Sequence, residues 1–157
     1  MNLKPLRAGL AGAVLVGLVG WSGLAHAQFS QVPSTALSVA PEPSAAADEA
    51  TYRKDAARHV YAAYPMRIHK GKLPPLLYAV MITDTEIDPT GQVVNVSVAR
   101  PPAAAKEVAP WVVSLIRKAS PFPAPTRIAG GNITYREIWL VDRTGLFQVD
   151  TLTEGQR

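Results

Sequence analysis

Between residues 76 and 98, apolar and polar positions are arranged as two arms around a short polar break. The break at 88–91 (DPTG) has the composition of a tight turn, in which proline fixes one φ angle and glycine tolerates a positive one. In the second arm Val94, Val96 and Val98 alternate with polar residues. Alternation with a period of two is typical of a half-buried strand, so this stretch predicts a β-hairpin.

Residues 49–64 place apolar side chains at the spacing of an amphipathic helix. Asp48 is suited to cap its N-terminus, because its carboxylate can accept hydrogen bonds from the free N–H groups of the first turn. Pro65 is expected to end the helix, since the residue before a proline is displaced from the helical conformation.

A second helix is predicted between residues 103 and 119, where the apolar positions form one broad stripe. The stripe consists of Val108, Trp111, Val112, Leu115, Ile116 and Ala119. Pro110 lies within this range, and we expect the helix to begin near Ala103 with a local distortion at the proline. The alternative is a helix in which Pro110 is the first helical residue. In both cases the stripe should pack on one face of the hairpin.

A third strand of eight to ten residues is predicted within residues 132–142, which are rich in β-branched and aromatic side chains. Alternation places Ile133, Tyr135 and Glu137 on one side of it. A turn at 142–145 follows, and the apolar residues after it allow a short fourth strand. The sequence therefore supplies three or four strands that can pair in antiparallel fashion.

These elements predict an α+β fold in the order α-β-β-α-β, or α-β-β-α-β-β when the fourth strand forms. Two helices would cover a three- or four-stranded antiparallel sheet in a two-layer sandwich. Phe122, held between prolines, is expected to fill the core under the second helix; the alternative is an exposed recognition element. One sheet edge should stay free, and an added strand from another chain could complete it.

The chain starts with a segment typical of a secretory signal peptide. Lys4 and Arg7 precede an uncharged apolar run, which ends in Ala25-His26-Ala27, a cleavage signal. We therefore expect residues 1–27 to be removed and the protein to reside in the periplasm. The alternative is an uncleaved leader that anchors the chain in the inner membrane.

Residues 28–47 are rich in proline, serine and alanine and predict a flexible linker. Residues 48–152 hold every predicted helix and strand, so they form the folded domain, and residues 153–157 are expected to be a disordered tail. The chain contains no cysteine, and an exported domain without disulfides must be stabilised by its core.

Charge argues against nucleic acid as a partner. The net charge is +4, and removal of Lys4 and Arg7 leaves 14 basic against 12 acidic residues, an excess too small and too scattered for that role. The densest basic cluster is the loop at 66–75, which includes Arg67 and Lys70. We interpret it as a solvated connection, with contact to an acidic partner or a phosphate-bearing surface as the alternative.

The sequence predicts no cofactor, no metal and no catalytic site. His59 and His69 lack a paired histidine or a cysteine at ligand spacing. Asp84 and Glu86 could perform acid–base chemistry as a pair. Their alternation with β-branched residues instead places them on a solvated face of the sheet.

Five motifs occur along the chain in a defined order: Tyr64-Pro65, IDPTGQV at 87–93, NVSV at 95–98, RKASPFP at 117–123, and the strand at 134–140. In order and spacing they resemble the C-terminal domain of TonB-type energy transducers and, more distantly, that of TolA. The resemblance covers residues 52–141. The chain departs from that family in the entry to its first strand, and it lacks the long proline-rich span of true transducers.

The resemblance implies a periplasmic, non-catalytic module that binds a segment of an envelope protein by strand addition at a free sheet edge. The occupant would be a segment of an outer-membrane receptor or a second copy of the domain. The candidate contacts are Tyr135, Arg136 and Ile138 in the last strand, and Arg67 and Lys70 in the basic loop. The alternative is an accessory energy transducer in TonB-dependent transport, anchored by its uncleaved leader.

Overall fold

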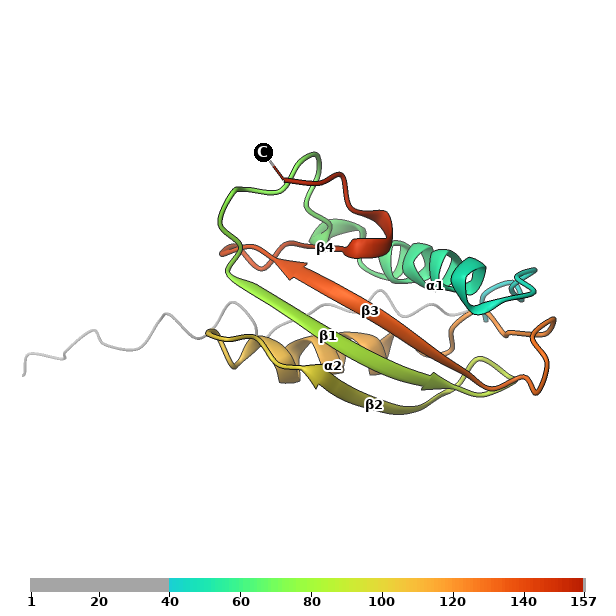
Figure 1. The fold of residues 1–157 in the computed structure, drawn as a ribbon. Helices are drawn as coiled ribbons and strands as arrows, with labels where there is room; N and C mark the ends of the chain where they lie inside the picture. Colours follow the sequence, from blue (N-terminus) through green and yellow to red (C-terminus); the bar gives the residue numbers. More distant parts are fainter. Residues whose placement is uncertain (1–39, 157) are drawn as a thin grey trace, which may run out of the picture.

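The computed structural model describes residues 40–156, so the predicted leader and most of the predicted linker lie outside the described residues (Figure 1). In chain order the elements are α1 (Glu49–Ala63), η2 (Pro65–Arg67), β1 (Ala79–Ile87), β2 (Val93–Arg100), α2 (Val108–Lys118), β3 (Ile133–Val141), β4 (Phe147–Val149) and η3 (Asp150–Leu152). The strands form one antiparallel sheet in the order β2-β1-β3-β4. The predicted α+β class is confirmed, and the fourth strand forms.

Both helices lie on one face of the sheet, with α2 across β1 and β2 and α1 across β3 (Figure 1). Alternate residues of β1 and β3 are buried on this face, and the predicted grouping of Ile133, Tyr135 and Glu137 on one side of β3 is confirmed. The two helices meet where the Tyr64 hydroxyl donates to the carbonyl oxygen of Leu115 at 2.7 Å. Residues 44–149 thus supply a complete hydrophobic core of their own.

Both hairpin turns have the same sequence pattern, Asp-x-Thr-Gly, and the same hydrogen bonds. In the β1–β2 turn the Asp88 carboxylate accepts the backbone N–H groups of Thr90 at 2.8 Å and Gln92 at 2.9 Å. In the β3–β4 turn Asp142 accepts the two equivalent bonds at 2.8 and 3.1 Å. The Thr90 hydroxyl and these backbone donors lower the pKa of Asp88 below its usual value, so the turn is held by a carboxylate.

Gly91 joins the first hairpin to the proline-rich segment after α2. Its φ is 90°, and a Cβ at this position would collide with the carbonyl oxygen of Phe122. The N–H of Phe122 donates to the Gly91 oxygen at 2.8 Å. The Phe122 ring is thereby held in the core, as the sequence predicted. Its centroid lies 4.8 Å from that of the His59 ring and 6.1 Å from that of the Tyr135 ring.

The expected start of α2 near Ala103 is wrong, because the helix begins at Val108. Ala105 has a φ of 50°, which interrupts any helix before that point. Pro110 then falls in the first turn, where backbone N–H groups have no partner within the helix, so it requires no distortion. The apolar stripe is confirmed, since Val108, Trp111, Val112, Leu115, Ile116 and Ala119 are all buried.

Val94 also departs from the expected pattern, because its side chain is 65% exposed. Ile87 pairs with Val93 while Glu86 pairs with Asn95, so Val94 is the extra residue of a β-bulge. The bulge turns Val94 outward and directs Val93 against the core instead. Alternation in sequence cannot reveal such an insertion, since it depends on the partner strand.

The folded unit extends beyond the predicted domain boundaries at both ends. Ser44 and Ala46 are buried, and the Ser44 hydroxyl donates to Asp55 at 2.7 Å, so this part of the predicted linker packs on α1. The predicted disordered tail is also held, because the N–H of Leu73 donates to the carbonyl oxygen of Gly155 at 2.8 Å. Within residues 40–156 no helix has both the length and the apolar character needed to cross a bilayer.

Candidate functional site

The two edge strands of the sheet, β4 and β2, differ in what lies beside them. Ile68 forms a parallel bridge with Phe147, and the N–H of His69 donates to the Phe147 oxygen at 2.9 Å. The side-chain amide of Gln148 donates to the carbonyl oxygens of His69 and Gly71 at 2.9 and 2.8 Å. The chain that precedes β1 therefore covers β4, and this edge is closed to another strand.

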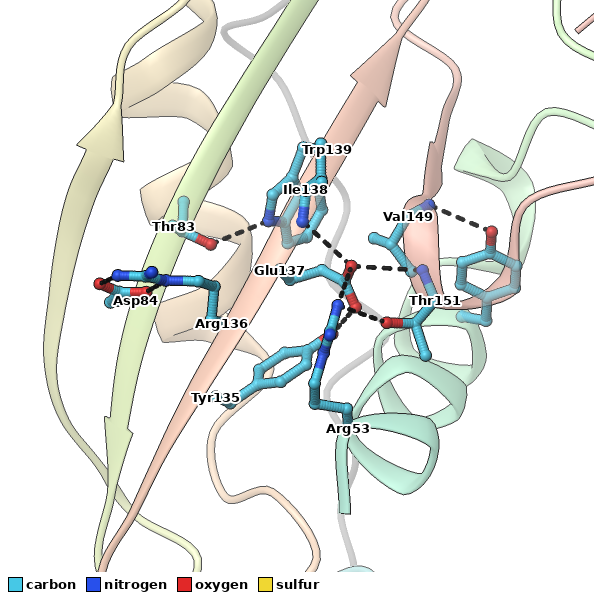
Figure 2. A network of polar contacts seen from close by, with 11 residues as sticks. Arg53, Thr83, Asp84, Tyr135, Arg136, Glu137, Ile138, Trp139, Val149 and Thr151 are labelled. Carbon is cyan, nitrogen blue, oxygen red and sulfur yellow. Dashed lines mark hydrogen bonds and ion pairs between the residues drawn. The ribbon is translucent and has the colours of Figure 1, made fainter. Parts of the chain in front are cut away.

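Beyond the short β4, the outer side of β3 is closed at Ile138 by the side chain of Glu137 (Figure 2). One carboxylate oxygen accepts the backbone N–H groups of Ile138 at 3.0 Å and Thr151 at 3.3 Å, and the other accepts the Tyr135 hydroxyl at 2.8 Å. The guanidinium of Arg53, from α1, lies 3.6 Å from the first oxygen. An added strand would need the Ile138 N–H, which is already occupied.

The buried carboxylate of Glu137 is stabilised by the groups that bond to it. The Glu137 side chain is 0% exposed, and a carboxylate without partners would cost several kcal/mol in such a place. Burial, followed by the neighbouring Glu137 charge, raises the pKa of the Tyr135 hydroxyl well above 10.0. Tyr135 consequently stays protonated and donates to the carboxylate at any physiological pH.

Within residues 40–156, β2 has a strand partner on one side only. The N–H of Asp88 donates to the Gln92 oxygen across the turn, which directs the backbone groups of even-numbered β1 residues toward β2. Their register partners Asn95 and Ser97 therefore point back toward β1. By alternation the backbone groups of Val96 and Val98 point away from the sheet, where an added strand could pair with them.

The sheet face opposite the helices carries a charged pair beside an aliphatic cluster. Arg136 donates two hydrogen bonds of 2.7 Å to the Asp84 carboxylate, and these bonds lower the pKa of Asp84 (Figure 2). The cluster consists of Val80, Ile82, Ile138 and Leu140, which are half-buried and face one another across β1 and β3. Asp84 thus forms an ion pair with Arg136 of the adjacent strand β3.

The candidate contacts in β3 differ in accessibility. Tyr135 is only 1% exposed, so it is inaccessible to a partner and its prediction as a contact is wrong. Arg136 and Ile138 lie on the uncovered face, in the part of β3 that precedes the three residues paired with β4, and the Ile138 N–H is bonded to Glu137. Sequence reasoning did not identify β2 as the open edge. The signal for it is the uncharged run at 89–99, which lacks the lysines that commonly protect edge strands.

The other candidate contacts, Arg67 and Lys70, lie in the connection between α1 and β1. Lys70 is exposed and Arg67 is half-buried. This connection lies beside β4, whereas the open edge is β2, so the structure separates the two groups of candidates across the width of the sheet.

Both described histidines have structural partners. His59 Nε2–H donates to the carbonyl oxygen of Ala119 at 2.7 Å, and His69 Nδ1 lies 2.8 Å from Asp142. Residues 40–156 contain no group of three or more histidine, aspartate or glutamate side chains that could hold a metal ion. The most distinctive chemical feature of this part of the chain is the unpaired backbone of β2.

Comparison of the chain with protein-family models, with curated proteins and with solved structures finds no match.

Proposed function

We propose that this protein is a non-catalytic binding module of the cell envelope that accepts an extended protein segment as a fifth strand beside β2. The observation that carries the proposal is the asymmetry of the sheet edges. The connection before β1 covers β4, and the Ile138 N–H of β3 is bonded to Glu137. The backbone groups of Val96 and Val98 in β2 point away from the sheet, and no strand lies beside them within residues 40–156.

The surroundings of β2 define the segment that fits. Trp111 lies on the flank of α2 that approaches β4, with its ring centroid 6.2 Å from that of Phe147. Ala109 and Val113, on the opposite flank, therefore lie toward the β2 edge and are half-buried. An added strand would place alternate side chains over this flank and the others on the open face. The ligand is accordingly a segment of alternating apolar and polar residues.

Two features of the sequence support the compartment and the binding mode. The leader at 1–27 is typical of exported proteins, and the resemblance to TonB-type C-terminal domains favours strand addition. The edge proposed here differs from the contacts first inferred from that resemblance, since it is β2, whereas Arg136 and Ile138 belong to β3.

The test is site-specific photo-crosslinking in cells that express the full chain. A benzoylphenylalanine at Val94, beside the open edge, is expected to capture an envelope protein, and the same probe at exposed Lys54 of α1 is not. A Val98→Pro change in the Val94 probe chain removes one outward N–H, which edge strands tolerate, and should abolish the adduct. Equal capture at both positions, or an adduct that survives the proline, would overturn the proposal.

N-terminal sequencing of the protein from cells separates the secreted module from an anchored accessory transducer. A mature chain that begins at Gln28 is expected. A retained leader, with Lys4 and Arg7 still present, would instead favour the anchored form. Strand addition at β2 is compatible with either, so this result is independent of the crosslinking result.

A further inference from the structure

The connection between α1 and β1 exposes large apolar side chains to an unusual degree. Met66 is 87% exposed and Leu76 is 85% exposed, and the third large apolar residue of this kind in residues 40–156 is Val94 on β2. Exposed side chains of this size gain free energy when they are removed from water. Two of them within one short connection indicate a contact surface.

The connection is firmly attached to the rest of the fold. Leu73 is fully buried and donates its N–H to the Gly155 oxygen at 2.8 Å. His69 Nδ1 lies 2.8 Å from the Asp142 carboxylate, and its carbonyl oxygen accepts from Gln148. Met66 and Leu76 are therefore presented by an ordered loop rather than by a segment that could fold back over them.

Cations lie in the same connection as these apolar side chains, and Met66 and Lys70 line one pocket. Residues 56–83 contain no aspartate or glutamate, and the loop carries Lys70 and Lys72, both exposed. Two carboxylates approach from other elements: Asp142 is 2.8 Å from His69, and Glu154 accepts the N–H of Gly71 at 3.1 Å. The surface combines exposed apolar tips with an excess of positive charge, which is complementary to anionic headgroups.

We propose that the connection from Pro65 to Leu77 docks the domain on the surface of an anionic phospholipid bilayer. Met66 and Leu76 would enter the headgroup–acyl boundary, while Lys70 and Lys72 would lie among the phosphates. Because the connection lies beside β4, at the opposite edge of the sheet from β2, a docked domain still offers β2 to a protein segment (Figure 1). The two surfaces act independently.

The test is flotation of the chain that begins at Gln28, which retains every described residue and lacks the apolar leader. Vesicles of phosphatidylcholine with about one-third phosphatidylglycerol should carry the protein at low salt, and pure phosphatidylcholine vesicles or high salt should not. The double variant Lys70→Glu/Lys72→Glu should reduce the bound fraction at least about tenfold. Met66→Ser/Leu76→Ser should also reduce it, with the net charge unchanged.

The matched control is Lys54→Glu/Lys118→Glu, which makes the same change in charge at two exposed lysines on α1 and α2. It should retain binding, and thermal melts should show that all variants are folded. Absence of binding to the anionic vesicles, or equal loss in the control and loop variants, would overturn the proposal. Because β2 is untouched in every variant, crosslinking from Val94 is unaffected by either outcome.

Discussion

At the scale of single residues, a few polar side chains decide which parts of the sheet can accept a partner. Glu137 closes β3 because its carboxylate is shared among groups from α1, β3 and η3. Alternation places Glu137 on the same side of the strand as Ile133 and Tyr135, but no local pattern reveals Arg53 or Thr151 as its neighbours. These contacts depend on how distant elements pack, so sequence reasoning wrongly left Tyr135 as a surface contact.

Replacement of Glu137 tests this closure. Glu137→Ala leaves the Ile138 N–H and the Tyr135 hydroxyl without their acceptor, and we expect a loss of about 2–4 kcal/mol in the free energy of unfolding. Glu86→Ala, on the solvated face, is the matched control and should change it by less than about 0.5 kcal/mol. Chemical denaturation measures both values. Equal effects of the two substitutions would contradict the assigned role of Glu137.

His59 predicts a specific pH dependence of stability. Burial lowers its pKa below 6.5, against the opposing hydrogen bond to Ala119. Between the folded-state pKa and 6.5 the unfolded chain binds more protons, so stability falls as pH falls through this window and levels off below it. His59→Gln, which cannot titrate, should flatten the unfolding free energy measured from about pH 7.5 to about pH 5. An unchanged slope in the variant would show that His59 is not its source.

At the scale of elements, hydrophobic periodicity identified both helices and all four strands. It failed where one residue breaks a pattern. Because Ala105 has a positive φ, α2 begins only at Val108. The bulge at Val94 changes which side chains at the start of β2 face the core and which face solvent. Both are backbone features set by neighbouring segments, and apolar spacing does not encode them.

The start of α2 has a direct mutational test. If Pro110 lies in the first turn, Pro110→Ala should alter the free energy of unfolding by less than about 1 kcal/mol, because no helical hydrogen bond is restored. Leu115→Ala, on the buried stripe, should destabilise the protein by about 2–5 kcal/mol. Denaturant titrations of both variants provide the values. A gain of about 3 kcal/mol for Pro110→Ala would indicate a helix that begins before the proline.

At the scale of the whole molecule, the sequence specified the α+β class but not the order of the strands or the identity of the free edge. The edges are set by contacts between segments far apart in the chain. The connection before β1 covers β4, and the C-terminal residues Thr153 and Glu154 bond to Gln148 beside it. The candidate site, β2, is therefore defined by what does not cover it within residues 40–156, and only the folded arrangement reveals this.

Amide hydrogen exchange followed by NMR in dilute solution tests the asymmetry of the sheet edges most directly. The N–H groups of Val96 and Val98 point away from β1 and should exchange orders of magnitude faster than those of Asn95 and Ser97. The N–H of Ile138, bonded to Glu137 at 3.0 Å, should be protected. Protection of Val96 and Val98 equal to that of Asn95 and Ser97, or free exchange at Ile138, would contradict an open β2 edge and a closed β3.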